Sequence, residues 1–154
     1  MSHTLTAAEV TQIERACERL VLVYSRRLDL GDLSGAADCF AVNGSLARPM
    51  TPDAVIEGRE AIRAGLMTRP ASLLTKHLAT NTMIDVVDSN HATGISYLTM
   101  IATTPAADAK PPFVSAGPLY FGEFRDEYVR EDGEWKFASR RGSIQMKFSG
   151  APAA

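Results

Sequence analysis

The sequence predicts an α+β fold in which helices cover one face of a strongly bent, mostly antiparallel sheet. Apolar residues recur at three- and four-residue steps between residues 10 and 28, as on one face of a helix. Residues 73–148 instead alternate and are rich in β-branched and aromatic residues, as in strands. Helices followed by an antiparallel meander favour the α+β class.

The first helix has clear signals at both ends. Thr6 and Glu9 have the spacing of a capping box, in which each side chain accepts from the backbone of the other. Gly31 is expected to end the helix, because glycine readily adopts the left-handed conformation found there. The predicted buried stripe consists of Val10, Ile13, Cys17, Leu20, Val21, Tyr24 and Leu28.

Shorter elements follow up to residue 70. Asp32 can cap a short helix over residues 33–40, and Asn43-Gly44 is a turn signal before a short strand over residues 45–48. A third helix is expected over residues 59–67, ended by Pro70.

The second half predicts four long strands. They span residues 73–87, 92–103, 119–130 and 135–148, and Asp132-Gly133 marks the last tight turn. Strands of this length must twist and bend, and Gly94, Gly122 and Gly142 are expected to form bulges. Residues 104–118 contain four prolines and are expected to form a loop, as a lid, an arm to a partner subunit, or a mobile insertion.

Composition narrows the function. The 154 residues are expected to form one domain, with an ordered core over about 6–148. A net charge of −2 argues against nucleic acid as a partner, and no apolar run could cross a membrane. Residues 1–8 do not resemble a secretory signal, and Cys17 and Cys39 are expected to be buried thiols in a reducing cytoplasm.

His77 is the main candidate for chemistry. It shares one predicted strand face with Thr75, Ala79, Asn81 and Met83, which are small or mixed in polarity, as in a pocket wall. Imidazole exchanges a proton near neutral pH, so His77 could be a general base. A core histidine bonded to a backbone carbonyl is the alternative, and the residues alone leave both open.

Several local motifs resemble the SnoaL-like branch of the nuclear-transport-factor-2-like superfamily. They are YSRRLDLGD (24–32), IEGREAI (56–62), KHLATN (76–81) and GEWKF (133–137). The resemblance covers roughly residues 8–148, and it implies a cone-shaped α+β barrel with a cavity between the helices and the sheet. The family includes scytalone dehydratase, bile-acid dehydratase, a lindane dehydrochlorinase, polyketide cyclases and catalytically silent members.

The resemblance implies a catalytic dyad. It places the eliminating members' aspartate and histidine at Asp29 and His77, and Tyr24 one turn earlier, where a tyrosine or lysine is common. Tyr24 could be a catalytic donor to a developing oxyanion, or a core aromatic with a bonded hydroxyl. Some dehydratases carry an acidic residue on the next strand, where this chain has Leu98-Thr-Met100. The helical period itself places Asp29 off the apolar stripe, so its role comes from the resemblance, whereas Tyr24 lies on that stripe.

Further residues are expected to bind substrate. Asn81 could steady an oxyanion or hold His77. Of the adjacent Arg140 and Arg141, parity with Trp135 and Phe137 favours Arg141 as the one that faces the cavity. The expected apolar lining includes Met83, Tyr97, Phe121 and Phe124.

Two functions remain open. The first is a cofactor-independent lyase or cyclase that acts on a hydrophobic, aromatic or polycyclic small molecule. The second is a non-catalytic binding module or a small subunit like that of aromatic-ring dioxygenases. No metal-ligand spacing or phosphate loop is present in the sequence, so we expect no metal and no cofactor. Bent sheets of this kind often pair face to face, so a homodimer or homotrimer is expected.

Overall fold

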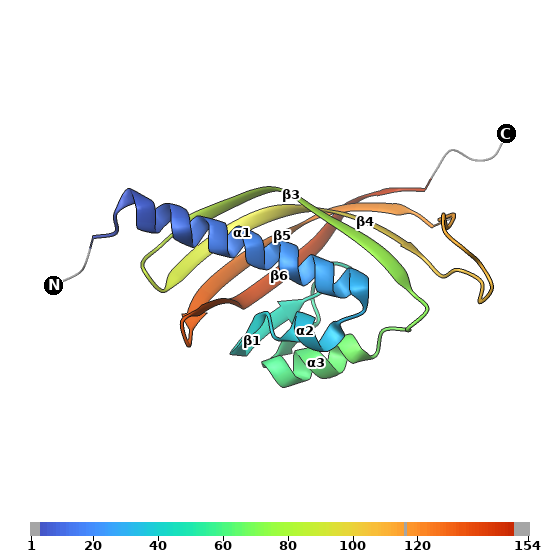
Figure 1. Ribbon diagram of the computed structural model, residues 1–154, viewed down its shortest axis with the longest axis horizontal. Coiled ribbons are helices and arrows are strands. Elements are labelled where there is room, and N and C mark those ends of the chain that lie inside the picture. The colour runs from blue at the N-terminus through green and yellow to red at the C-terminus, as the bar shows by residue number, and fades with distance from the viewer. Residues whose placement is uncertain (1–3, 116, 150–154) are drawn as a thin grey trace.

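The computed structural model describes residues 4–115 and 117–149 and confirms the predicted α+β fold. Its sheet has the strand order β2-β1-β6-β5-β4-β3, and neighbours are antiparallel except for the parallel pair β1 and β6. Figure 1 shows α1 crossing the bent sheet, with α2, α3 and β1 gathered on one side. The elements are α1 (Ala7–Leu30), α2 (Leu33–Ala37), β1 (Phe40–Ala47), β2 (Val55–Glu57), α3 (Arg59–Met67), β3 (Leu74–Val86), β4 (His91–Thr103), β5 (Leu119–Glu131) and β6 (Glu134–Phe148).

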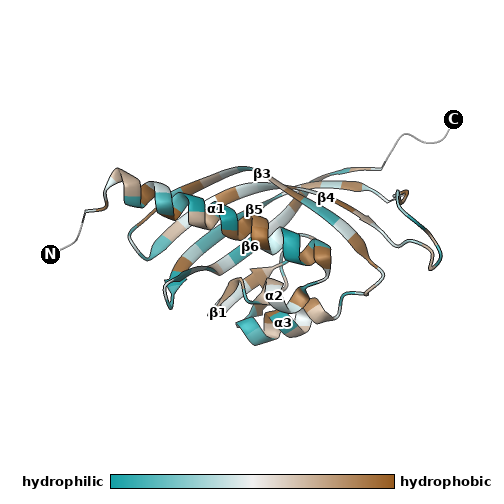
Figure 2. Cartoon of the chain, in the orientation of Figure 1, coloured by the Kyte–Doolittle hydropathy of each residue, from teal (hydrophilic) through white to brown (hydrophobic). Residues whose placement is uncertain are grey.

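Helix α1 begins and ends as its sequence predicts. The Thr6 hydroxyl accepts from the Glu9 amide, and the Glu9 carboxylate accepts from the Thr6 amide, which completes the capping box. Gly31 has a φ of 75° and ends the helix in the left-handed conformation. Hydrophobic and hydrophilic residues alternate along the helix in Figure 2.

The core lies between α1 and the inner face of the sheet, which we define as the face that carries Phe137 and Ala92. The rings of Tyr24 and Phe40 meet edge to face at 5.7 Å, and Phe137 lies 5.8 Å from Tyr24. The other buried members of this core include Ile13, Cys17, Val21, Leu28, Leu46, Ile62, Leu66 and Tyr128. Cys17 and Cys39 are both buried and unpaired, as expected.

The region between α1 and α3 differs from its prediction. Helix α2 is shorter than expected, and β1 begins at Phe40 rather than at residue 45. Its register with β6 shifts between Phe40 and Ser45, so Asn43-Gly44 marks an irregularity inside a strand rather than a turn before one. A Cβ on Gly44 would lie 2.7 Å from the Phe137 carbonyl oxygen, so glycine is needed for this close approach. The three-residue β2 was not predicted.

A bulge in β3 changes which residues face the core. Thr80 pairs with Tyr97 but Met83 pairs with Ile95, so β3 contains one extra residue at this point. Asn81 lies in this bulge with a φ of 50°. Before it, Thr75 and His77 face inward; after it, the inward residues are Ile84 and Val86, which pack on the core. The expectation that Met83 shares the face of His77 is therefore wrong.

The strand glycines have more than one role. Gly122 borders a register shift between β5 and β6, as expected of a bulge. A Cβ on Gly94 would lie 2.8 Å from the Met83 carbonyl oxygen, and one on Gly142 would lie 2.4 Å from Pro49 Cγ. Both of these glycines allow close packing, and the bulge prediction is wrong for them.

The outer face of the sheet, opposite the core, carries exposed apolar side chains near one end of the strands. Exposed patches of this kind often mark contact surfaces. We expect the predicted homodimer or homotrimer to form there, and this stays a prediction. The residues are Leu74, Leu78, Tyr97, Ile101, Met146 and Phe148.

Two further expectations concern the whole chain. The single domain over residues 1–154 stays a prediction, and residues 1–3, 116 and 150–154 lie outside the described part. Among the helices that the structure describes, none combines the length and the apolar character needed to span a membrane.

The bulge at Asn81 can be tested by substitution. Asn81→Val should lower the free energy of unfolding by about 1–2 kcal/mol, because a β-branched residue is strained at positive φ, whereas Asn81→Gly should be tolerated. Urea denaturation gives both values. Thr80→Val, at an exposed neighbouring position, is the control. Equal stability of Asn81→Val and the control would show that the left-handed residue is not needed.

Candidate active site

The end of α1 meets β3 at the two residues expected to form a dyad. The Asp29 carboxylate lies in the last turn of α1, and its Oδ1 is 2.6 Å from His77 Nδ1. Both side chains are largely buried, with 8% and 11% of their surfaces exposed. The helical period places Asp29 off the apolar stripe, but the helix end abuts β3, so its carboxylate still reaches the inner face.

The Asp29 carboxylate accepts two further hydrogen bonds from β3. Its Oδ2 accepts from the His77 backbone amide at 3.0 Å, and its Oδ1 accepts from the Thr75 hydroxyl at 2.9 Å. Arg69 donates in turn to the Thr75 hydroxyl at 2.7 Å and to the Leu73 carbonyl at 3.0 Å. A continuous chain of hydrogen bonds therefore runs from Arg69 to the imidazole.

These bonds favour the ionised form of Asp29 and determine which ring nitrogen of His77 carries the proton. Burial raises the pKa of the Asp29 carboxyl, but the hydrogen bonds from His77 and Thr75 outweigh burial and hold that pKa below its ordinary value of 3.8. An ionised carboxylate only accepts hydrogen bonds, so His77 Nδ1 carries the proton in the neutral ring. The lone pair is then on Nε2, the atom at the free side of the ring.

His77 lines a cavity of about 460 Å³, a size typical of small-molecule sites. We call the buried lining residues the floor of the cavity, and the exposed or half-buried ones its mouth. The buried lining residues are Tyr24, Ser25, Leu28, Leu66, Leu98 and Phe124; the others, besides His77, are Arg48, Pro49, Met50, Thr51, Thr68, Arg69, Pro70, Leu73 and Met100.

Tyr24 lies at the floor of this cavity. Burial raises the pKa of its hydroxyl to about 12, against the opposing charge of Arg140, so the group stays protonated at neutral pH. Its ring packs on Phe40 and Phe137, and its hydroxyl makes no hydrogen bond to any described residue. The hydroxyl is thus available to a ligand as a donor.

Of the residues predicted to bind substrate, only Phe124 is among those that line this cavity. Phe124 lines the cavity, as expected. Asn81 lies in the bulge of β3, is exposed, and is not among the residues that line the cavity. Met83 and Tyr97 are 64% and 51% exposed, and Phe121 is half-buried outside the cavity lining. The expectation that these four residues line the cavity is wrong. No described residue of the loop 104–118 lines it either.

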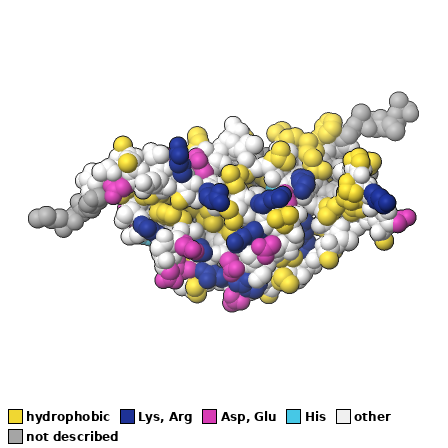
Figure 3. Space-filling model, viewed as in Figure 1, with side chains coloured by type: hydrophobic (Ala, Val, Ile, Leu, Met, Phe, Trp, Pro, Cys, Tyr) yellow, Lys and Arg dark blue, Asp and Glu magenta, His cyan; other side chains and the backbone are white. Residues whose placement is uncertain are grey.

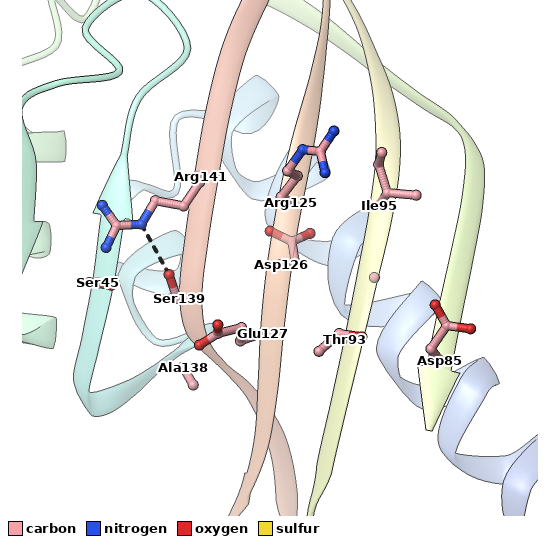
Figure 4. A pocket seen from close by; sticks show the side chains of 11 residues that line it. Ser45, Asp85, Thr93, Ile95, Arg125, Asp126, Glu127, Ala138, Ser139 and Arg141 are labelled. Carbon is pink, nitrogen blue, oxygen red and sulfur yellow. Dashed lines mark hydrogen bonds between the residues drawn. The ribbon is translucent and has the colours of Figure 1, made fainter. Parts of the chain in front are cut away.

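The inward arginine is Arg140, not Arg141. Glu127 pairs with Ser139 but Tyr128 pairs with Phe137, so β6 holds one extra residue, Ala138, which reverses its parity. Arg141 is exposed and lies beside Ser45 and Ser139 in a hollow on the outer face, seen in Figure 4 with α1 behind the sheet. Parity counted from Phe137 without this bulge gave the wrong residue.

Arg140 forms a buried ion pair beneath the cavity floor. Its guanidinium donates to Asp126 Oδ2 at 2.7 Å, and 1% and 0% of the two side chains are exposed. The guanidinium also stacks 3.8 Å from the centre of the Phe124 ring. Burial raises the pKa of Asp126 to about 6, although Arg140 opposes this. The pair supports two floor residues, Tyr24 and Phe124, from behind.

Sequence reasoning missed the polar residues that support the site. Arg69 and Thr75 support Asp29 through contacts made only in the folded chain, although Thr75 shares the strand face of His77. Arg48 follows β1 without any motif around it. Asp126 alternates with Phe124 and Tyr128 on one face of β5, and a carboxylate within an aromatic stripe is a signal of a buried ion pair.

One protein-family model matches most of the chain. The model of the SnoaL-like domain matches residues 9–141. The chain belongs to the SnoaL-like domain family. None of the curated proteins compared is significantly similar to this SnoaL-like chain.

Solved structures share the fold of this SnoaL-like domain. A candidate scytalone dehydratase from Novosphingobium aromaticivorans DSM 12444 is 24% identical, with a TM-score of 0.77 over 97% of this chain and 95% of its own. A type 2 hexachlorocyclohexane dehydrochlorinase is 16% identical, with a TM-score of 0.76 over 96% and 95%. A protein from Catenulispora acidiphila in complex with S-DNPA is 22% identical, with a TM-score of 0.66 over 84% and 91%.

The buried ion pair predicts a contrast between adjacent arginines. Arg140→Met should lower the free energy of unfolding by about 3–5 kcal/mol at neutral pH, because it leaves the Asp126 carboxyl buried without its partner. Arg141→Met should change it by less than about 0.5 kcal/mol, as expected of an exposed side chain. Chemical denaturation of both variants measures the contrast, and equal effects would contradict the inward position of Arg140.

The bonds to Asp29 predict a pH-dependent contribution to stability. Because folding lowers the pKa of this carboxyl, its contribution is present above pH 3.8 and is lost as the pH falls through the folded-state value. The stability difference between the wild type and Asp29→Asn should therefore be larger at pH 5 than at pH 3. Urea denaturation at both values measures it, and a difference independent of pH would count against these hydrogen bonds.

Proposed function

We propose that this protein is a cofactor-independent lyase that removes a proton from carbon in a hydrophobic small molecule. The observation that carries this proposal is the 2.6 Å contact between Asp29 and His77 at the wall of an apolar cavity. The names of the dehydratase and the dehydrochlorinase with this fold point to the same class of reaction, elimination.

His77 Nε2 is the proposed base. It takes the proton from a carbon next to a carbonyl or a leaving group, and the electrons of the broken C–H bond form a carbon–carbon double bond as the leaving group departs with its electron pair. Asp29 is a positioning residue that keeps the proton on Nδ1 and stabilises the imidazolium that forms, as a carboxylate does in a triad. An aldol-type cyclisation begins with the same proton transfer.

Tyr24 is the proposed hydrogen-bond donor in this reaction. Its hydroxyl is protonated, lacks a partner among the described residues and lies at the cavity floor. Such a donor stabilises negative charge on a substrate oxygen as that charge develops. The apolar floor strengthens this interaction, because water is largely excluded from it.

The alternative, a purely binding module, would not require the ordered dyad. Three hydrogen bonds to Asp29 fix the imidazole on the inner face, and a partly polar arrangement of this kind is not needed to bind an apolar ligand. The geometry therefore favours catalysis over passive binding.

The base can be tested with 5-nitrobenzisoxazole. Removal of its ring proton breaks the N–O bond and yields a coloured nitrophenolate, so any positioned base in an apolar cavity accelerates it. His77→Gln should reduce kcat/KM by at least about a hundredfold. His91→Gln, which changes an exposed histidine bonded to Asp88, is the matched control and should leave the rate unchanged.

Two results would contradict the proposal. One is a His77→Gln variant with near-normal turnover. The other is a wild-type protein no faster than free imidazole at the same concentration. Circular dichroism of each variant separates loss of the base from loss of the fold.

A further inference from the structure

The cavity has an uneven distribution of charge. Two arginines, Arg48 and Arg69, line it, and no aspartate or glutamate is among its described lining residues. The chain as a whole carries a net charge of −2, so this excess of positive charge is local to the cavity.

Neither arginine has a carboxylate partner within the described chain. Arg48 makes no hydrogen bond or ion pair there, and Arg69 donates only to a carbonyl and a hydroxyl. Arg63, by contrast, bonds Asp38 and Glu60, in the region of α2 and α3 where Figure 3 shows interleaved acidic and basic side chains. Arg48 and Arg69 therefore retain donors that can bind a ligand.

Both arginines lie at the mouth of the cavity, on two different loops. Arg48 directly follows β1 and is exposed, and its Nη2 lies 3.9 Å from where a Cβ on Gly65 of α3 would be. Arg69 directly follows the C-cap of α3 and is half-buried. The charges of both act on the Tyr24 hydroxyl. Both arginines line the same cavity, so they can act on one ligand.

The partial burial of Arg69 adds to this argument. Burial lowers the pKa of its guanidinium, although the charge of Asp29 opposes the shift. A half-buried cation that bonds no carboxylate directly is unfavourable, and a bound anion relieves that cost. A guanidinium also matches a carboxylate in geometry, since it can donate two parallel hydrogen bonds.

We infer that the substrate is an amphipathic anion, an apolar body with a carboxylate that Arg48 and Arg69 hold at the cavity mouth. The apolar body lies on the floor formed by Leu66, Leu98 and Phe124, within reach of His77. The inference rests on the proposed function for its statement that the ligand is a substrate; the preference for an anion rests on the cavity alone.

A matched pair of probes tests this preference. The carboxylate 2-naphthoate and its neutral analogue 2-naphthamide have nearly the same shape, and titration calorimetry measures both affinities. The wild type should bind the carboxylate at least about tenfold more tightly, which is about 1.4 kcal/mol. Higher salt should weaken binding of the carboxylate but not of the amide.

Variants test whether the two arginines cause the preference for the carboxylate. Arg48→Met and Arg69→Met should each remove most of the preference for the carboxylate and change the amide affinity less than twofold. Arg48→Met is the cleaner variant, because Arg69 also bonds Thr75 beside the dyad. Arg141→Met, on the outer face, is the matched control and should retain the full preference.

The outcomes separate this inference from the proposed function. Equal affinity of the wild type for both probes, or binding of neither, overturns the anionic substrate. Retention of the preference in both arginine variants also overturns it. His77→Gln should keep the preference for 2-naphthoate while it loses turnover of the neutral nitrobenzisoxazole. A failed anion preference with His77-dependent turnover would leave the proposed function standing.

Discussion

The Asp29 carboxylate is the constraint on which the site depends. It accepts hydrogen bonds from the His77 backbone amide, the His77 ring and the Thr75 hydroxyl, so one side chain joins the end of α1 to β3. This contact sets the position of the helix end and the orientation of the imidazole together. Gly31 allows it, because the helix ends two residues later instead of continuing past the strand.

The bulges determine the rest of the inner face. In β3 the extra residue at Asn81 lets one strand place His77 beside the cavity and Ile84 against the core. In β6 the extra residue Ala138 places Arg140 inward, next to Asp126 on β5. Without these bulges, the same sequence would place Ile84 and Arg140 on the outer face.

Local signals made much of the fold predictable. Some signals depend only on the local backbone conformation, and each lies where it was expected. They are the capping box, Gly31 and the tight turn at Asp132-Gly133. The bulges at Asn81 and Ala138 were not predicted, because an extra residue is set by pairing with a distant strand. One uncounted residue in β6 reversed the assignment of Arg140 and Arg141, and one in β3 moved Asn81 and Met83 out of the cavity.

The site was predictable only in part. His77 was singled out by its strand face and Tyr24 lies on the apolar stripe, whereas the role of Asp29 came from the family resemblance. The structure brings all three to one region. Arg48 and Arg69 had no local signal, since their relevance depends on two loops that meet only in the folded chain. The catalytic roles of Asp29, His77 and Tyr24 and the binding roles of the two arginines stay proposals.

The tautomer of His77 tests the central claim most directly. Long-range ¹H–¹⁵N NMR correlations of the ring, recorded at a pH where it is neutral, distinguish a proton on Nδ1 from one on Nε2. The account predicts a proton on Nδ1, held by Asp29, and a free lone pair on Nε2. A neutral ring with its proton on Nε2 would contradict the account, because no base would then face the cavity.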